Sequence, residues 1–448
     1  MASAYLQNTT TTATDTKKFT WSFWFKRSKI LNGASAQRFI NIHQDANNKV
    51  NSEFGTDDRF YYFDKRGGST VFNIETLQNF RDPSAWYHMV IAVDTTQSTQ
   101  SDRVKVYVNG TLADLNTLTA PALNAETGTQ VVTATNQRRI GTTDTASTFY
   151  DGLVSHMHFT DGYTYQASTF GETDSTSGIW KPKTSPSVTY GTNGFFLKME
   201  NSSDMGEDSS GNNNDFTTSG TITQTEDTPS NNFCTWNAIN PFGGSLTNGN
   251  LTVGNNSSFN HNAQGTLGIT SGKWYWEYKM GNTHGEFGIC ENSKSPQSNP
   301  QSNFPFYFLY GNGSENYSYN NATSAVSGTL VSGSQFSTND ILGVAFDADN
   351  GKLYFHLNGT YYNSGNPASG TGELISGIQI QFGGVFVPFL GFGTSSARTN
   401  FHANFGNGYF GTTAVSSSNS DGAGLGLFEY SVPSGYYALC TKNIKNYG

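Results

Sequence analysis

The chain has 448 residues, of which 25 are Lys or Arg and 34 are Asp or Glu, so only 13% are charged. An ordinary soluble domain has about 25%. The net charge of -9 argues against a nucleic-acid partner, because phosphate binding needs clustered Lys and Arg. Aromatic residues reach 14%, which argues against disorder. The apolar runs are too short for a membrane span, so membrane insertion is not expected.

The start of the chain and its cysteines bear on the compartment. The first residues lack the basic and apolar segments of a secretory signal, so none is expected. Cys234, Cys290 and Cys440 are odd in number and widely spaced, so neither a disulfide framework nor a zinc site is indicated. We interpret them as reduced core residues.

Alternation of apolar and polar residues recurs along the first third of the chain, which favours β-strands. Residues 19–27 place Phe19, Trp21, Phe23 and Phe25 on one face. Such faces need a partner sheet, so the pattern predicts a β-sandwich. Further strands are expected at residues 86–94, which are apolar on both faces, at 103–110, which end in an Asn-Gly turn, and at 151–159.

Between residues 165 and 232 the composition shifts to Ser, Thr, Asn, Gly and Asp. Residues 194–200 are too apolar for a free linker, so we expect a late strand of the first sandwich there. The linker itself is expected at residues 223–232, which are polar and contain a proline.

From Phe233 the strand pattern resumes. The clearest local signal is Asp349-Asn350-Gly351 between two alternating segments, where the Asn-Gly pair predicts a type I′ hairpin turn. The fold class is therefore all-β, with two tandem antiparallel, jelly-roll-like β-sandwiches and negligible helix. Strands are expected at residues 271–280, 284–290, 304–311, 340–359 and 383–393.

Several segments of the first region occur in a familiar order, namely FTWSFWFKR, WYHMVIAVD, RVKVYVNG and IGTTDTASTFYDGLVSHMHFTDG. Together they span residues 3–162 and resemble a laminin-G-like domain of the concanavalin A-like lectin and glucanase superfamily. DSSGNNND (208–215) is similar to a DxSGNxND piece of such domains, but it follows the other strands, which suggests a permuted order.

Segments of the second region resemble a SPRY domain, another sandwich, over residues 233–410. They are SGKWYWEY, FGIC, DILGVAFDADNGKLYFHLNG and RTNFHANFG. The Asn-rich residues 310–322 depart from that family, so its peptide-binding loops are not carried over. The expected organisation is a first domain at 1–222 with its core at 3–162, a linker at 223–232, and a second domain at 233–448 with a C-terminal extension.

The combination of the two regions, with GIWKPKTSPSVTYGTNGFF between them and FEYSVPSGYYALCTKNI (428–444) near the end, resembles virion proteins of marine tailed bacteriophages. This resemblance implies a non-enzymatic structural protein on the virion exterior, assembled in the host cytoplasm. Its implied partners are other capsid or tail proteins and a host-surface glycan, and virion symmetry suggests a homotrimer. A tail-tip or tail-fibre receptor-binding subunit is the alternative to a capsid or tail accessory.

A polysaccharide-degrading enzyme is a further alternative, which the carboxylates disfavour. A glycosidase needs two carboxyl groups across the scissile bond. Glu172 and Asp174 have alternate spacing but lie in a loop-like stretch, and Glu277 stands alone on its strand. No GxSxG nucleophile elbow is present either.

Two groups of residues are candidate metal ligands. Calcium prefers oxygen ligands, which a cluster around a glycine supplies, although the same residues are typical of turns. His156 and His158 alternate on one strand and suit a transition metal, but outward polar residues are the simpler interpretation. No other cofactor is expected. The calcium candidates are Asp204, Asp208, Asn212 and Asp215.

A carbohydrate-binding surface is the sharpest functional hypothesis. Saccharides bind flat aromatic faces and amide or carboxylate side chains. Two clusters of Tyr and Asn have this chemistry, although solvated loops in an Asn-rich chain show the same composition. The candidates are Tyr310, Asn312, Asn316, Tyr317, Tyr319 and Asn320 in one loop-like segment, and Tyr361, Tyr362 and Asn363 in another.

Overall fold

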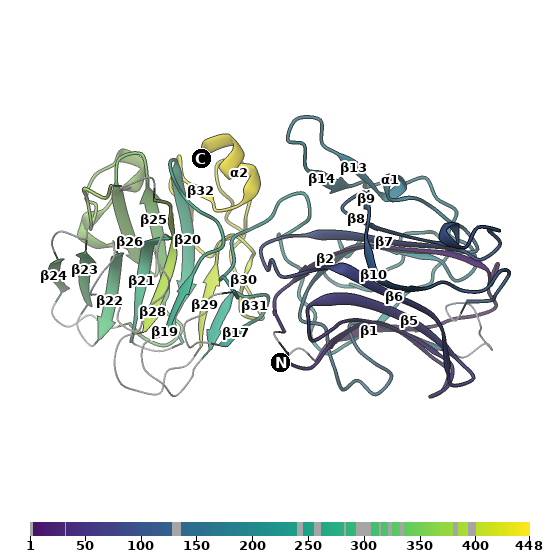
Figure 1. The fold of residues 1–448 in the computed structure, drawn as a ribbon. Helices are drawn as coiled ribbons and strands as arrows, with labels where there is room; N and C mark the ends of the chain where they lie inside the picture. Colours follow the sequence, from purple (N-terminus) through teal and green to yellow (C-terminus); the bar gives the residue numbers. More distant parts are fainter. Residues whose placement is uncertain are drawn as a thin grey trace. The chain divides into compact units, whose positions relative to one another are not determined.

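The computed structural model divides into two compact units, Met1–Gln224 and Thr225–Gly448. Its fold is nearly all-β with antiparallel sheets, as the alternation predicts (Figure 1). None of the described helices is long and apolar enough to cross a membrane. The described helices are α1 (Ala167–Phe170), α2 (Thr441–Tyr447), and the 3-10 turns η1 (Gln100–Asp102), η3 (Tyr362–Ser364) and η4 (Pro367–Ser369).

The structure describes residues 3–31, 33–127, 136–239, 245–254, 261–281, 284–292, 306–312, 315–320, 325–331, 336–379, 384–392 and 400–448. Only the backbone is described at 261, 284, 310–312, 315–320, 325–331 and 392.

The first unit is a sandwich of two sheets. Its larger sheet contains, in order, β10 (Leu115–Thr119), β6 (Ser69–Asn79), β5 (Arg59–Arg66), β4 (Lys49–Phe54), β3 (Gln37–His43), β11 (Gln137–Ile140), β1 (Tyr5–Thr9) and β16 (Thr217–Ser219). Its smaller sheet contains β15 (Phe195–Leu197), β12 (Gly152–Asp161), β2 (Lys18–Arg27), β7 (Tyr87–Asp94), β8 (Val104–Val108) and β9 (Thr111–Leu112).

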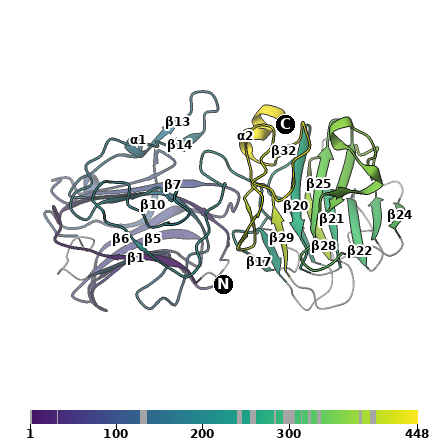
Figure 2. The same cartoon turned by 180° about the vertical axis from the view of Figure 1, so that it is seen from behind.

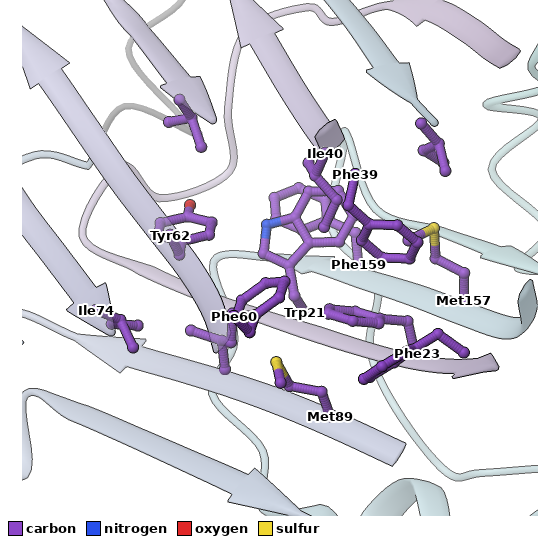
Figure 3. Close-up of a cluster of buried hydrophobic side chains, with 14 of the residues drawn as sticks. Trp21, Phe23, Phe39, Ile40, Phe60, Tyr62, Ile74, Met89, Met157 and Phe159 are labelled. Atoms are coloured by element: carbon purple, nitrogen blue, oxygen red, sulfur yellow. The ribbon is translucent and has the colours of Figure 1, made fainter. Parts of the chain in front are cut away.

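The core of the first unit forms where aromatic faces of the two sheets meet. Phe19, Trp21, Phe23 and Phe25 of β2 are fully buried, which confirms the predicted inner face. Figure 3 shows Trp21 and Phe23 among side chains from both sheets. Ring contacts fill the space between the two sheets, such as that of the tilted Phe23 and Phe39 rings with 5.0 Å between ring centroids.

The outer face of the smaller sheet is covered as well. The short hairpin of β13 (Gly171–Thr173) and β14 (Trp180–Pro182) lies near α1 beside β7 (Figures 1 and 2). Its Trp180 packs with Phe170 against Val90. The even-numbered residues of β2 are therefore buried too, and both faces of β7 are buried as predicted.

Two late strands complete the first unit. β15 lies within the segment expected as a late strand and pairs with β12, while β16 pairs with β1. Asn193, just before β15, accepts the Thr11 backbone N–H at 2.7 Å. The buried Arg138 donates to the Asn193 backbone oxygen at 3.0 Å and lies over the Phe195 ring. Residues 193–219 are thus an integral part of this sandwich.

The second unit has two facing sheets, here named the β20 sheet and the β22 sheet. The β20 sheet contains β17 (Ser245–Thr247), β18 (Thr252–Gly254), β29 (Phe401–Asn404), β20 (Lys273–Lys279), β25 (Ile341–Asp347), β26 (Lys352–Leu357) and β27 (Thr360–Tyr361), with β32 (Tyr437–Ala438) parallel beside β20. The β22 sheet contains β19 (His261–Gln264), β28 (Phe386–Phe392), β21 (His284–Glu291), β22 (Phe306–Asn312), β23 (Glu315–Asn320) and β24 (Ala325–Val331). A separate hairpin joins β30 (Tyr409–Phe410) and β31 (Thr413–Ala414).

The turn between β25 and β26 differs from the prediction. Asp347 pairs with Lys352, so four residues form the loop, and of the Asn-Gly pair only Gly351 has positive φ, 61°. A type I′ turn requires positive φ at both central residues, so that assignment is wrong. The loop is longer because Asp347 caps it, accepting the Asn350 backbone N–H.

Candidate functional site

The first predicted carbohydrate cluster lies on strands. Residues expected to form a solvated loop belong to β22 and β23, which are neighbours near one edge of the β22 sheet. The loop expectation is wrong because cross-strand pairing with β22 and β24 overrides the turn preference of Asn and Ser.

The register divides this cluster between the two faces of the sheet. Tyr317 and Tyr319 pair with Leu309 and Tyr307, which are buried in the core between the sheets. Directly opposite residues of an antiparallel pair share a face. The two tyrosines therefore occupy positions on the core-side face.

The remaining members of the cluster occupy the outer face. Asn316 pairs with Tyr310, and Asn320 pairs with Phe306, one residue out of phase with the core positions. Because the side-chain period of a strand is two, Asn312 belongs to this face too. The outer positions of β22 include Phe306 and Phe308, which are buried in a separate apolar cluster with Cys290, Val387 and Phe389. The polar outer positions of β22–β24 carry amides, hydroxyls and one tyrosine. They are Tyr310, Asn312, Asn316, Ser318, Asn320, Ser327 and Thr329.

A buried carboxylate lies next to these outer positions, on the neighbouring strand, and continues them as a row across the sheet. Glu286 of β21 pairs with Tyr310 on one side and with Gly391 of β28 on the other. Glu286 is 2% exposed. A Cβ at Gly391 would lie 2.6 Å from the Glu286 Oε2, so this glycine makes room for the carboxylate. Asn262 of β19 pairs with Gly391 and continues the row.

Sequence reasoning missed Glu286 and Asn262. The signal for Glu286 was its place in HGEFGIC, where it is the only acidic residue of an otherwise uncharged strand core. The strands beside Glu286 come from distant parts of the chain. Its partner Gly391, for example, lies 105 positions further along. Only the strand order reveals the row.

The second cluster lies on the β20 sheet. Tyr361 ends β27 and is half-buried, with its ring centroid 5.1 Å from that of His356. Tyr362 and Asn363 belong to η3, and the exposed Asn363 donates from Nδ2 to the Glu373 backbone oxygen at 3.2 Å. The two predicted clusters are therefore on different sheets.

The calcium candidates form turn networks. Asp208 Oδ1 accepts the backbone N–H groups of Phe196 at 2.8 Å and Ser210 at 2.9 Å, and its Oδ2 accepts that of Asn214 at 2.9 Å. Asp215 Oδ1 accepts the backbone N–H of Asp208. These hydrogen bonds engage both carboxylate oxygens of Asp208 and one of Asp215.

The other two members of this group also have local partners. Asp204 accepts the Gly206 backbone N–H at 3.0 Å, and Asn212 donates to the backbone oxygens of Gly191 and Gly194. Over the described part of the chain, no three or more His, Cys, Asp or Glu side chains are arranged to hold a metal ion. The DSSGNNND segment fastens residues 191–196 to the first unit.

The histidine pair does not lie on an open strand face. A register shift between Ser155 and His158 interrupts β12, and His156 has φ of 44°. His158 is 1% exposed, with its ring stacked 3.8 Å from that of Phe196. The expectation of two outward polar residues is wrong, because the register shift in β12 and the Phe196 ring stacked on His158 bury this histidine.

The paired carboxylates of the glycosidase alternative lie on a hairpin where a loop was expected. Glu172 belongs to β13, and Lys181 of β14 lies 3.7 Å from its carboxylate and 3.0 Å from that of Asp174. The backbone N–H of Ser177, followed by Lys181, lowers the pKa of Asp174 well below its ordinary value. A general acid needs a raised pKa, so Asp174 is not suited to acid catalysis.

The first unit carries a family match. Residues 1–166 match the model of the Concanavalin A-like lectin/glucanases superfamily. The first unit has a concanavalin A-like fold. This match confirms the resemblance drawn from the strand segments of the first region. No curated protein matches the chain.

Similar solved structures include two SPRY domains and a pentraxin. The SPRY domain of human HERC1 is 16% identical, with 38% of this chain and 96% of that chain covered and a TM-score of 0.29. The TRIM65 PSpry domain is 15% identical, with 38% and 89% covered and a TM-score of 0.28. The heptameric SAP-like pentraxin from Limulus polyphemus is 13% identical, with 36% and 71% covered and a TM-score of 0.27.

Proposed function

We propose that this chain is a non-enzymatic structural protein on the exterior of a tailed-phage virion, and that it adheres to host-surface glycans. The proposed glycan site is formed by the polar positions on the outer face of β22–β24. One observation carries the site. The register gathers Tyr310, Asn312, Asn316 and Asn320 on a single face and excludes Tyr317 and Tyr319 from it.

The chemistry of this face suits a neutral glycan. A tyrosine ring packs against sugar C–H groups, and amides both donate to and accept from hydroxyls. Neutral hydrogen bonds lose little to salt screening, in contrast to exposed ion pairs. Weak single sites suffice on a particle, because multivalency raises avidity about 10²- to 10⁴-fold.

The carboxylates support the non-enzymatic part of the proposal. Glycosidases place two carboxyl groups about 5–5.5 Å or about 6.5–9.5 Å apart across the scissile bond. The positions paired with Glu286 in register are Tyr310 and Gly391. Two other glutamates are buried on these strands: Glu291 lies five residues along β21, at a position of the opposite face, and Glu277 belongs to the β20 sheet.

A glycan-binding experiment tests the site. Asn316→Ala and Tyr310→Ala should each weaken binding of the purified protein to host-envelope polysaccharide by about tenfold or more, because each removes a contact from the proposed face. Asn363→Ala is the matched control, since it removes an exposed amide from the other sheet. Loss of binding in the control alone would reject the outer face of β22–β24 as the site.

Two further observations test the remainder of the proposal. Release of reducing sugar from the same polysaccharide would contradict a non-enzymatic role. Electron cryomicroscopy of the particle should place the chain on the exterior. Tens to hundreds of copies indicate a capsid or tail accessory, whereas a handful indicates a receptor-binding subunit of the tail tip.

A further inference from the structure

The strands of the two units follow the same order along the chain and within the sheets. In the larger sheet of the first unit, the neighbours are β6, β5, β4, β3, β11 and β1, and in the β22 sheet they are β24, β23, β22, β21, β28 and β19. In the smaller sheet, β12, β2, β7, β8 and β9 match β29, β20, β25, β26 and β27 of the β20 sheet. The strands β1–β9, β11 and β12 therefore correspond one by one to β19–β29.

An ion pair recurs at corresponding places in the two units. β2 begins with Lys18, which lies directly opposite Asp94 in register, with 3.9 Å between Nζ and the carboxylate. β20 begins with Lys273, which lies directly opposite Asp347 in the same way at 3.0 Å. The correspondence of β2 with β20 and of β7 with β25 thus extends to single residues.

A turn contact recurs as well. After β8, Asn109 Oδ1 accepts the His88 backbone N–H at 2.8 Å. After β26, Asn358 Oδ1 accepts the Ile341 backbone N–H at 2.9 Å. Because strand order, ion pair and turn contact all agree, the two units are copies of one sandwich plan. A face of one unit therefore identifies its counterpart in the other.

The counterpart of the outer face of β22–β24 is the outer face of β4–β6, and this face carries two neighbouring aromatic residues. Phe60 and Tyr62 of β5 are buried in the core between the sheets. Tyr61 and Phe63 alternate with them, so they belong to the outer face, where both are half-buried. Their partly exposed rings offer a ligand a flat apolar surface.

Polar contacts hold the first of these rings. The Tyr61 hydroxyl donates to Asp57 Oδ2 at 3.0 Å. Glu75, directly opposite Tyr61 in register, accepts from Arg59 at 2.7 Å and from the Asn116 amide at 2.8 Å. Arg59 also lies 3.6 Å from the Asp57 carboxylate. Each charge beside Tyr61 thus has a partner of the opposite sign, and the ring is fixed before a ligand arrives.

An amide lies beside the second ring. Asn73 of β6 pairs with Phe63 on one side and with Thr119 of β10 on the other (Figure 1). It is half-buried, and its side chain has no hydrogen-bond partner within the described part of the chain. An amide both donates and accepts, as a sugar hydroxyl does. Since adjacent strands lie about 4.8 Å apart, the row from Phe63 to Thr119 is about 10 Å long.

We propose that the outer face of β5, β6 and β10 is a second carbohydrate site, which packs a neutral sugar against Phe63 and Tyr61 and hydrogen-bonds its hydroxyl groups through Asn73. This inference rests on the proposed function, because it assigns to this face the class of ligand proposed for the outer face of β22–β24. One chain then binds two oligosaccharides, so each copy on a particle contributes two weak contacts to avidity.

The lysines of this face distinguish a neutral sugar from an acidic one. Lys49 and Lys65 lie directly opposite each other on β4 and β5, and Lys65 is two residues from Phe63. An acidic sugar would place its charged group near this pair, because like charges opposite each other in a sheet favour a bound anion. The row of Phe63, Asn73 and Thr119 carries no charge, so a neutral sugar does not depend on the lysines.

Equilibrium dialysis of the full chain counts the sites, with neutral oligosaccharides released from host-envelope polysaccharide as the probe. The unaltered chain should bind two oligosaccharides. Phe63→Ala and Asn73→Ala should each weaken one of the two sites by about tenfold or more and leave the other unchanged. Tyr310→Ala should weaken the other site, and combining it with Phe63→Ala should weaken both.

Lys65→Ala is the matched control, because it alters the same strand and the same face, and binding should not change. If Phe63→Ala does not fold, Asn73→Ala decides the question, since it removes only a half-buried amide without a partner in the described structure.

The outcomes separate this inference from the proposed function. A single site that Tyr310→Ala weakens, and that Phe63→Ala and Asn73→Ala leave unchanged, would overturn the second site alone. Binding that Phe63→Ala and Asn73→Ala weaken, and that Tyr310→Ala leaves unchanged, would support the face of the first unit and reject the outer face of β22–β24. A loss in Lys65→Ala as large as that in Phe63→Ala would overturn the neutral ligand.

Discussion

At the scale of single residues, the first unit depends on buried polar groups whose partners come from distant segments. His88 of β7 is fully buried. The Trp180 indole N–H donates to its Nδ1 at 3.0 Å, which leaves Nε2 to donate to the Ser22 hydroxyl at 2.9 Å. The Trp24 ring stacks on the imidazole. The neutral tautomer is therefore the one that this environment accepts.

This environment predicts an acid-sensitive first unit. Burial lowers the pKa of His88 from 6.5 to about 3. The stability that depends on neutral His88 is present above pH 6.5 and is lost as the pH falls toward 3, by on the order of 5 kcal/mol in total. Hydrogen exchange of the β7 amides should show protection that falls steadily below pH 6.5.

Substitution separates this effect from a general loss of stability. His88→Gln should lower protection at neutral pH but flatten its decline in acid, because the titrating group is gone. His156 and His158, whose pKa values burial also lowers, contribute to the remaining decline. His43→Gln, on the larger sheet, should leave the slope unchanged. An unchanged slope in His88→Gln would contradict the assignment.

Residue patterns alone could predict the aromatic core of the first unit but not the partners of its buried polar groups. The inner face of β2 was readable because four aromatic residues alternate within nine positions. The partners of His88 were not, because Trp180 lies in a hairpin 92 residues along the chain. The same holds for Glu277, a lone carboxylate in the sequence that meets Glu429 and Tyr430 across 152 and 153 residues.

At the scale of elements, turns show how backbone conformation and space act together. The Asn109-Gly110 and Asn358-Gly359 turns have positive φ at both residues, and each joins strands separated by two residues. Between β25 and β26 only Gly351 has positive φ, and a Cβ there would overlap the Ile378 backbone oxygen. Gly351 is thus restricted by both conformation and contact.

Alanine substitution should distinguish these two restrictions. Gly351→Ala should lower the free energy of unfolding of the second unit by about 2 kcal/mol or more, since a positive φ costs about 1–2 kcal/mol and the overlap adds to it. Gly377→Ala is the control, because Gly377 has φ of 72° with no atom within 4 Å of a Cβ. Urea unfolding monitors both, and equal losses would show that the contact with Ile378 contributes nothing.

Of the strands that carry the proposed glycan site, β22 lies largely within the strand expected at residues 304–311, whereas β23 and β24 could not be recognised from their residues. Asn and Ser favour turns, so the segment around residues 310–320 is typical of a loop in composition. In the structure, β22 and β24 flank β23 and provide its hydrogen bonds. The register that separates the tyrosines of β23 from its asparagines follows from that pairing, which composition does not encode.

At the scale of the whole molecule, the first unit extends beyond the part that matches the lectin and glucanase family. The match ends at residue 166, yet β15 pairs with β12 and β16 pairs with β1. The aromatic strands of residues 19–159 predicted the sandwich itself, whereas short strands such as Thr217–Ser219 have no apolar pattern to reveal them. The positions of β15 and β16 follow from the strand edges of β12 and β1 that they cover.

Truncation should reveal the importance of these late strands. A fragment of residues 1–224 contains a complete unit and should unfold in one cooperative transition. A fragment of residues 1–166 lacks β15, β16 and Asn193, so it exposes an edge strand and leaves the buried Arg138 without its Asn193 partner. We expect the shorter fragment to aggregate or to unfold at a markedly lower temperature, as measured by calorimetry and light scattering.

The pairing of β1 also affects how the chain is made. β1 lies between β11 and β16, so its first neighbour is synthesised about 130 residues later and its second about 210 residues later. On the ribosome, the earliest strand to emerge therefore waits for almost the entire first unit before both of its edges are covered. Pauses in translation once β16 has left the ribosome would favour completion of this sheet before the aromatic strands of the second unit appear.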